Sequence, residues 1–304
     1  HLQWKDVHSW KPETGPLWVH LDRTKPDAQR WLRKRSGLDP VICDALLAEE
    51  TRPRGLTVGE GLLVNLRGVN LNPGEEPDDM ISVHIWVDAD RIITLRAPRL
   101  LAVSDVREQL NAGAGPKSPG GIMVAIAERL TERIAPVLMN LDELVDAVEE
   151  QVIDKPDSSL RRNLSNIRRQ AITLRRYIAP QREAITHLQN SQTALLSQRN
   201  ILRLRECSDR TTRYVEDLDT IRERAAVVHE EIAGRTSEQM NRTMYALSLV
   251  AGIFLPLGFV TGLLGINVGG MPGVESPIAF SIVCLALVGL AGTSYYIFRR
   301  MKFF

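Results

Sequence analysis

Two long uncharged segments near the carboxyl end constrain this chain more than any other feature. Met244 to Leu264 and Ile278 to Phe298 each hold 21 residues without Asp, Glu, Lys, Arg or His, although 25% of the chain is charged. At about 1.5 Å of rise per residue, each helix would cross the roughly 30 Å apolar core of a bilayer. Two buried helices of a soluble core are the alternative, which the short Gly-rich connection disfavours. The sequence therefore predicts two transmembrane helices.

Basic residues near these segments predict their orientation. Arg235 and Arg242 precede the first span, Arg299, Arg300 and Lys302 follow the second, and the connecting loop has no Lys or Arg. Since basic residues favour the cytosolic side of a membrane, we expect both termini in the cytosol and the loop outside.

The amino-terminal third has the residue pattern of a mixed α/β domain. Branched and aromatic residues dominate LWVHLD, GLLVNLRGV and ISVHIWVDADRIITLRA, which read as strands bounded by Gly, Pro and Asp. PDAQRWLRKRSG and PVICDALLAEE lie between them and read as helices. We expect a cytosolic α/β domain over residues 1–110, followed by a loop or linker at residues 111–121.

Heptad spacing of apolar residues predicts long packed helices after this domain. The apolar steps of four and three residues occur in three runs: Ile134, Leu138, Leu141, Val145, Val148 and Val152, then Leu160, Leu164, Ile167, Ala171, Leu174 and Ile178, then Tyr214, Leu218, Ile221, Ala225, Val228 and Ile232. The first two runs predict a helical hairpin within residues 111–198. The third predicts a stalk over 199–242 that continues into the first span, as one helix from about Arg199 to Gly265, with Gly234 and Pro256 as candidate kinks.

Charges beside the first two runs are segregated. Acidic pairs stand at 142–143 and 149–150, and arginine pairs stand at the matching positions 161–162, 168–169 and 175–176. We interpret these as an acidic and a basic arm that form mutual ion pairs, and prefer this to a nucleic-acid surface because the acidic strip is equally regular. The acidic strip attracting cations to a pore mouth is a further alternative.

Motifs of common enzyme classes do not occur in the sequence, which holds no nucleotide loop, no Gly-x-Ser-x-Gly elbow and no paired-cysteine site. The nearest approach is HEEIA, where Ala233 stands in place of the second histidine of a zinc-protease helix. We therefore predict that the chain is not an enzyme. His229, Glu230 and Glu231 remain a candidate cation site on the stalk, with a solvated charge patch as the alternative.

Small residues mark one side of the first span. Gly258 and Gly262 form a Gly-x-x-x-Gly step, which lets helices approach closely in a bundle. Two helices cannot enclose a water path by themselves, so a pore requires an oligomer. The candidate pore-lining residues follow heptad steps: Met244, Leu247, Ala251, Leu255, Gly258 and Gly262. Met244 and Leu255 would supply apolar rings that close the path by dewetting.

The segment IFLPLGFVTGLLGIN, Ile253 to Asn267, resembles the CorA-type divalent-cation transporter family with its Gly-x-Asn signature. Its Gly-Ile-Asn form is similar to the ZntB-like zinc-transporting branch, whereas the magnesium channels of the family carry Gly-Met-Asn. The resemblance extends over essentially the whole chain, from the α/β domain through acidic and basic helices and a stalk to the two spans.

The resemblance implies a funnel-shaped homopentamer in the bacterial inner membrane, with membrane lipid and a divalent metal cation as its partners and no nucleic acid. The first span, 243–266, would line the pore, and a filter of Gly265, Ile266 and Asn267 would hold a hydrated cation through amide and carbonyl oxygens. Glu275, in the periplasmic loop 267–277, would form an acidic ring that concentrates cations. The second span, 278–298, and a basic cytosolic tail, 299–304, complete the chain, and no cofactor is expected.

Three functions agree with these features. The first is zinc import, with proton coupling left open, and the second is a general divalent-cation channel for magnesium, cobalt or nickel. The third is a membrane-anchored coiled-coil scaffold or sensor, which the short outer loop disfavours. Oxygen ligands suit hard cations, while zinc prefers nitrogen and sulfur, so the preference for zinc comes from the resemblance alone.

Overall fold

A computed structural model describes residues 7, 9–49, 51–154, 158–266, 273 and 276–300, with the backbone alone at residues 153, 154 and 158. The chain divides into two compact units, His1–Glu230 and Glu231–Phe304. The predicted boundary at residue 110 therefore falls inside one unit. We describe each unit by itself.

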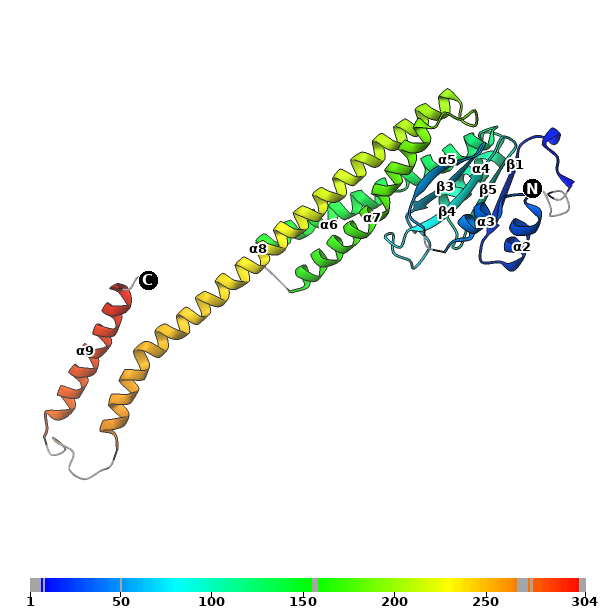
Figure 1. Cartoon of the computed structure of the whole chain (residues 1–304). Coiled ribbons are helices and arrows are strands. Elements are labelled where there is room, and N and C mark those ends of the chain that lie inside the picture. Colours follow the sequence, from blue (N-terminus) through cyan, green and yellow to red (C-terminus); the bar gives the residue numbers. More distant parts are fainter. Residues whose placement is uncertain are drawn as a thin grey trace. The chain divides into compact units, whose positions relative to one another are not determined.

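A five-stranded sheet forms the centre of the first unit (Figure 1). Its strands are β1 (Leu17–Asp22), β2 (Arg54–Val58), β3 (Gly61–Gly68), β4 (Ile81–Val87) and β5 (Arg91–Arg96). Their spatial order is β1-β5-β4-β3-β2, and only the β1–β5 pair is parallel among the four pairings. A tight turn joins β2 to β3, where Gly59 takes a φ of 59°, a backbone conformation that costs glycine little.

Helices cover both faces of this sheet because its central strands are apolar on both sides. The short helix η1 (Pro12–Thr14) precedes β1, and α2 (Pro26–Arg35) and α3 (Pro40–Leu47) pack on one face through Trp31, Leu32 and Leu46. On the other face lie α4 (Leu101–Asn111) and α5 (Pro119–Glu132). The linker expected at 111–121 is thus shorter, since Ser118 caps α5 by accepting a hydrogen bond from the Gly121 amide.

Three long helices carry the heptad runs: α6 (Ala135–Asp154), α7 (Ser158–Asn190) and α8 (Gln198–Leu264). Their apolar seams are buried together in one core, which includes Leu141, Leu174 and Leu218. The sheet core extends into the same helices, because Ile185 of α7 and Leu204 of α8 pack against α5 and the strands. Through these contacts α7 and the first part of α8 belong to the same compact unit as the sheet.

The helix α8 has 67 residues, which corresponds to about 100 Å, and its limits differ by one residue from the predicted Arg199 to Gly265. Pro256 lies inside it. The last helix, α9 (Ala279–Arg300), closely follows the predicted second span. Both α8 and α9 contain a window that is long and apolar enough to cross a membrane, and neither window is buried inside the structure. An exposed apolar surface of this size is unsuited to water.

Candidate functional site

One face of α8 in the second unit is covered by α9. A Cβ placed on Gly252 would lie 2.3 Å from Cζ of Phe298, so the glycine allows the ring of α9 to touch the α8 backbone. The half-buried residues Leu249, Pro256 and Val260 share this side of α8. The opposite face therefore lacks a partner within the described part of a single chain.

The predicted pore-lining stripe lies mainly on that uncovered face. Met244, Leu247 and Leu255 are exposed by 58%, 68% and 71%. A Cβ on Gly258 or Gly262 would meet no atom within 4 Å. Ala251, which belongs to the same stripe, is half-buried. The geometry therefore leaves an apolar ridge, with Gly258 and Gly262 as its two small residues, free to contact other copies or to line a path.

The end of α8 marks the start of the predicted filter. The Gly265 amide donates to the carbonyl oxygens of Thr261 at 2.9 Å and Gly262 at 3.2 Å, which closes the last turn. The Thr261 hydroxyl donates to Leu257 O at 3.0 Å, so it is satisfied within the helix. Ile266 follows and is 49% exposed. The other predicted members of the mouth, Asn267 and Glu275, lie outside the described residues.

The candidate cation site on the stalk shows no cluster within one chain. His229, Glu230 and Glu231 are all exposed, and consecutive helical residues point about 100° apart. Glu231 forms an ion pair with Arg235 at 2.6 Å. Within the described residues, no group of three or more His, Cys, Asp or Glu side chains is placed to hold a metal ion.

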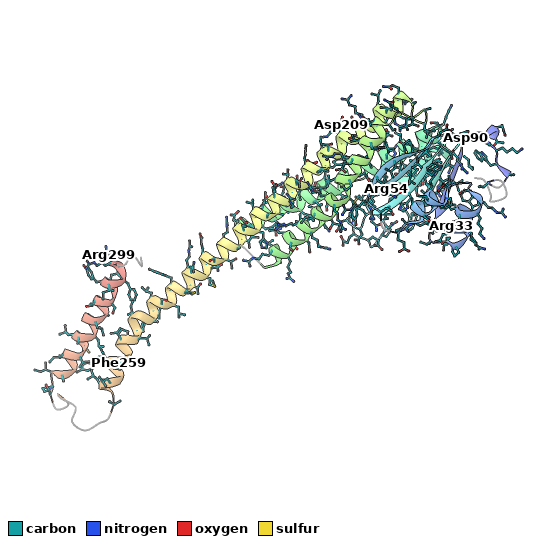
Figure 2. The ribbon with its side chains drawn as sticks, viewed as in Figure 1. Arg33, Arg54, Asp90, Asp209, Phe259 and Arg299 are labelled. Carbon is teal, nitrogen blue, oxygen red and sulfur yellow. The ribbon has the colours of Figure 1, made fainter. Side chains whose placement is uncertain are left out.

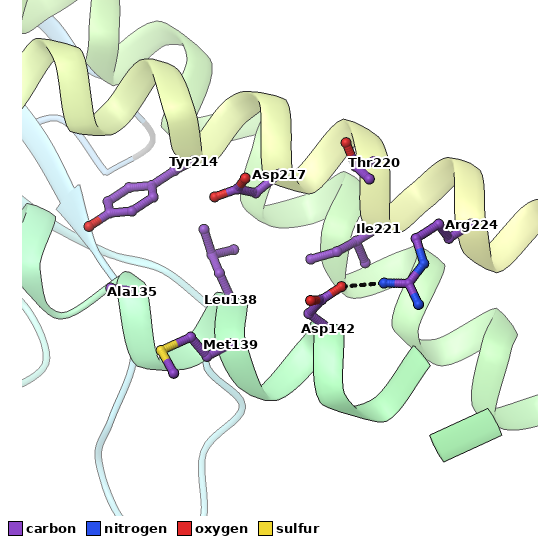
Figure 3. Close-up of a pocket in the computed structure, with 9 residues that line it drawn as sticks. All are labelled: Ala135, Leu138, Met139, Asp142, Tyr214, Asp217, Thr220, Ile221 and Arg224. Atoms are coloured by element: carbon purple, nitrogen blue, oxygen red, sulfur yellow. Dashed lines mark hydrogen bonds and ion pairs between the residues drawn. The ribbon is translucent and has the colours of Figure 1, made fainter. Parts of the chain in front are cut away.

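The acidic arm pairs with α8 rather than with the basic arm. Arg224 of α8 contacts Asp142 of α6 at 2.6 Å (Figure 3). It also contacts Glu149, at 2.8 Å, and Asp146 on the same helix. The expected mutual ion pairs are not formed at three of the predicted positions: Asp142 and Glu149 pair with Arg224, and Arg175 pairs with Asp219 of α8. The third helix explains this difference from the prediction. Helix α8 completes the core and packs beside the flank of α6 that the hairpin prediction assigned to α7.

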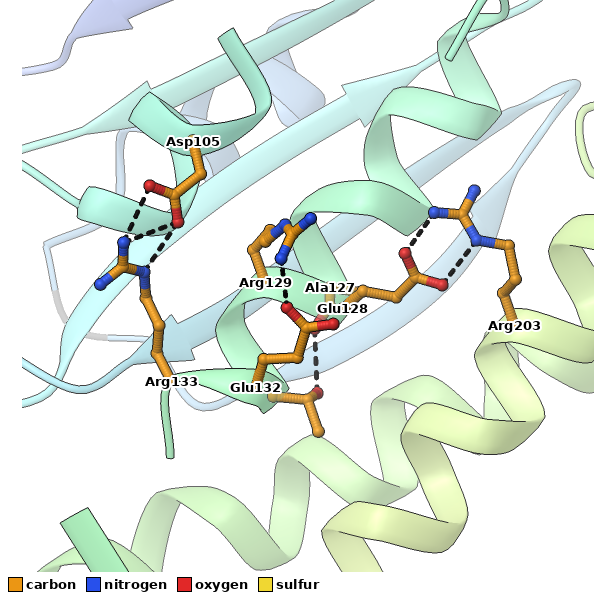
Figure 4. Close-up of polar contacts among 8 residues, drawn as sticks. Asp105, Ala127, Glu128, Arg129, Glu132, Arg133 and Arg203 are labelled. Carbon is orange, nitrogen blue, oxygen red and sulfur yellow. Dashed lines mark hydrogen bonds and ion pairs between the residues drawn. The ribbon is translucent and has the colours of Figure 1, made fainter. Parts of the chain in front are cut away.

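Further ion pairs, which the sequence did not suggest, fix α5 to its neighbours (Figure 4). Arg133 donates two hydrogen bonds of 2.8 Å to Asp105 of α4, and Arg203 of α8 makes a two-pronged contact with Glu128 of α5. Forked arginine–carboxylate pairs fix orientation as well as distance. They connect the start of α8 to the helices that cover the sheet.

Two histidines are held neutral inside the sheet domain. Burial is the largest cause that lowers the pKa of His84 to about 4, and nearby arginines lower it further. Its Nδ1 lies 2.7 Å from Leu46 O and its Nε2 lies 3.1 Å from the Thr51 hydroxyl. Burial and Arg96 likewise lower the pKa of His20 to about 4. The partners of His84 connect the sheet to its loops.

The fold and these apolar helices define a membrane protein with two spans and a large folded unit before them. A family model described as CorA-like Mg2+ transporter protein matches residues 13–300. The chain therefore belongs to this family, and its relatives place it with the ZntB-like branch.

Two relatives are similar over nearly their whole length. The divalent cation transporter CmaX of Pseudomonas aeruginosa is 46% identical over 94% of this chain and 87% of its own. The zinc transport protein ZntB of Pectobacterium atrosepticum is 37% identical over 94% and 88%.

Solved structures agree with the fold. The full-length CmaX structure matches with a TM-score of 0.84 and 45% identity over 94% of this chain and 88% of that one. The CorA magnesium transporter of Methanocaldococcus jannaschii matches with a TM-score of 0.79 at 18% identity, over 93% and 90%. At that identity the second match supports the architecture alone.

Proposed function

We propose that this chain transports divalent cations across a bacterial inner membrane, through a path lined by the carboxyl-terminal part of α8 in a homopentamer. The observation that carries this proposal is the uncovered stripe of α8, whose apolar ridge and two glycines, Gly258 and Gly262, have no partner among the described residues of one chain. Family membership supports the same conclusion, because the relatives are transporters. Neither the motifs nor the family indicates an enzyme.

Zinc is the first candidate cargo, because the Gly-Ile-Asn motif resembles the zinc branch and several relatives are zinc transport proteins. A broader divalent-cation activity is the second candidate, and the relative named a divalent cation transporter, at 46% identity, favours it. A membrane potential of 100 mV favours entry of a divalent cation by about 4.6 kcal/mol, so import is the expected direction. Neither span contains a titratable Asp, Glu or His, so proton coupling would have to use groups outside them.

The filter is tested at Asn267. If its neutral amide holds the water shell of the cation, Asn267→Ala and Asn267→Ser lose that contact, and Asn267→Asp adds a negative charge from every copy. We expect all three variants to assemble normally and to lose most zinc flux in liposomes. Size-exclusion profiles provide the control for assembly. Normal flux through a correctly assembled Asn267→Ala protein would remove this residue from the filter.

The cargo is tested in the same liposomes. Fluxes of zinc, magnesium, cobalt and nickel should be compared with and without a pH gradient. A zinc flux at least tenfold above the others supports the zinc assignment, and comparable fluxes support the broader channel. An increase in zinc flux with an inward proton gradient supports coupling.

A further inference from the structure

A groove with an acidic rim lies between α6 and α8 on the surface of the first unit (Figure 3). Its volume is about 380 Å³. The groove is lined by Ala135, Leu138, Met139, Asp142, Tyr214, Asp217, Thr220, Ile221 and Arg224. Apolar side chains form its floor, and Met139 is 64% exposed there. Such a surface suits a long basic side chain, whose stem needs apolar contact and whose head needs carboxylates.

Negative charge exceeds positive charge in and beside this groove. Arg224 is shared among three carboxylates of α6, as described above. Asp217 has no ion pair among the described residues and is exposed. Burial, Asp142 and Glu216 raise the pKa of Asp217, in that order of influence. Since α6 and α8 run in the same direction, Asp142 and Asp217 form a like-charge pair across the groove, where a coiled coil usually places opposite charges.

Positive charge exceeds negative charge on the flank of α8 that faces α7. Asp219 is shared by Arg175 of α7, at 2.7 Å, and Arg222, at 3.3 Å. Arg168 lies one heptad before Arg175, and Arg169 follows it. Both are exposed and have no ion pair within the described part of the chain. Glu223, 73% exposed, is the other carboxylate near Arg222. This basic flank is therefore defined by Arg168, Arg169, Arg175 and Arg222.

The acidic groove and the basic flank lie on opposite sides of α8. Asp217 and Asp219 are two residues apart, so their side chains point about 200° apart around the helix. The packing of α6, α7 and α8 around one core agrees with this arrangement. The outer groove between α6 and α8 faces away from α7, and the basic flank lies on the side of α8 that faces α7. Opposite and complementary surfaces on one chain match a head-to-tail contact, which forms a ring when the rotation from one copy to the next closes.

We infer that the acidic groove of one copy receives the basic flank of α7 and α8 of a second copy. This inference rests on the oligomer in the proposed function and names the surfaces that form it in the first unit. A second copy fits better than another occupant because it supplies arginines at the same heptad spacing as the acidic side chains. A metal ion would use only the groove, and a nucleic acid would use only the flank, so each would leave the other surface unexplained.

Cross-linking tests which surfaces meet. In a Cys284→Ser background, Asp217→Cys combined with Arg168→Cys should give a ladder of covalent multimers with a short bismaleimide, because Cys43 and Cys207 are buried. Asp209→Cys with Arg168→Cys is the matched control, since Asp209 lies on α8 outside the groove (Figure 2) and should give at least tenfold less product. Light scattering on the detergent-solubilised full chain measures the oligomer independently.

Charge exchange tests whether complementarity drives the contact. Asp217→Arg breaks no ion pair among the described residues, relieves the repulsion from Asp142 and loses only the attraction of Arg213, so the fold should survive. Single Asp217→Arg and Arg168→Glu variants should each lower the yield of the ring at low salt, on the order of tenfold. Their combination should restore it, and Asp209→Arg should leave it unchanged. The effect should shrink at about 1 M salt, where the Debye length is near 3 Å.

The outcomes separate the two proposals. An oligomer by light scattering without the expected ladder, or single variants with a normal ring yield, overturns the assigned surfaces and leaves the proposed function standing. A monomeric wild-type chain overturns the oligomer itself, and with it the path through the membrane.

Discussion

At the scale of residues, His84 shows how a polar group is retained in an apolar sheet. It is fully buried in β4, yet both ring nitrogens have partners, so the ring connects Leu46 at the end of α3 with the Thr51 loop. The pattern ISVHIWV predicted the strand but not these partners, because they depend on two loops distant in sequence. Buried polar groups need such partners, and a single sequence does not display them.

The lowered pKa of His84 makes stability depend on pH. The unfolded chain takes up a proton near pH 6.5, whereas the folded chain resists it until about pH 4. The contribution to stability is therefore complete above pH 6.5 and is lost as the pH falls toward 4, by up to about 3 kcal/mol. We expect His84→Asn to melt at a lower temperature at pH 7.5 but to lose less between pH 7.5 and 4.5. Thermal melts at both pH values measure this difference, with a variant at an exposed histidine, His187→Asn, as the control. If the melting temperature of His84→Asn changes with pH as much as that of the wild type, the prediction is wrong.

At the scale of elements, the heptad runs predicted burial well and partners poorly. All six apolar positions of the run that starts at Ile134 and continues through α6 are buried, as are five of the six in the run of α8. The run predicts which side of each helix is apolar, and this side must be buried whatever the topology. It does not predict which neighbour lies beside each flank. Asp142 and Glu149 of α6 accordingly pair with Arg224 of α8, because the choice of partner depends on how three helices close one core.

The stripe on α8 gives a prediction for the gate. If Leu255 faces the path, Leu255→Ser should make the closed pore wet and raise the basal flux of cations into liposomes severalfold. Phe254→Ser is the matched control, because Phe254 is 66% exposed and points about 100° away on the same helix turn. The measurement is flux at equal protein content. A leak in Phe254→Ser with wild-type flux in Leu255→Ser would assign the path to the other face.

At the scale of the whole molecule, the average composition does not reveal that the chain combines two apolar spans with a strongly polar remainder. The mean hydropathy of −0.12 is that of an ordinary water-soluble protein, while 0% of each span window is buried. Only the segregation of charge along the sequence separates the spans from the rest. The same segregation predicts orientation, since Lys and Arg flank the spans on one side only.

The predicted orientation places Ser276 in the periplasm and Ser237 in the cytosol. Both positions are exposed in the second unit, so cysteines there should react with a maleimide wherever the reagent can reach them. In a Cys284→Ser background, an impermeant maleimide should label Ser276→Cys in cells whose outer membrane alone is opened. Ser237→Cys should be labelled only after the inner membrane is permeabilised. The two variants make the same Ser-to-Cys change, so they differ only in place. Labelling in the reverse order would mean that the chain crosses the membrane in the opposite orientation. The proposed direction in which the membrane potential drives the cation, relative to the chain, would then be reversed as well.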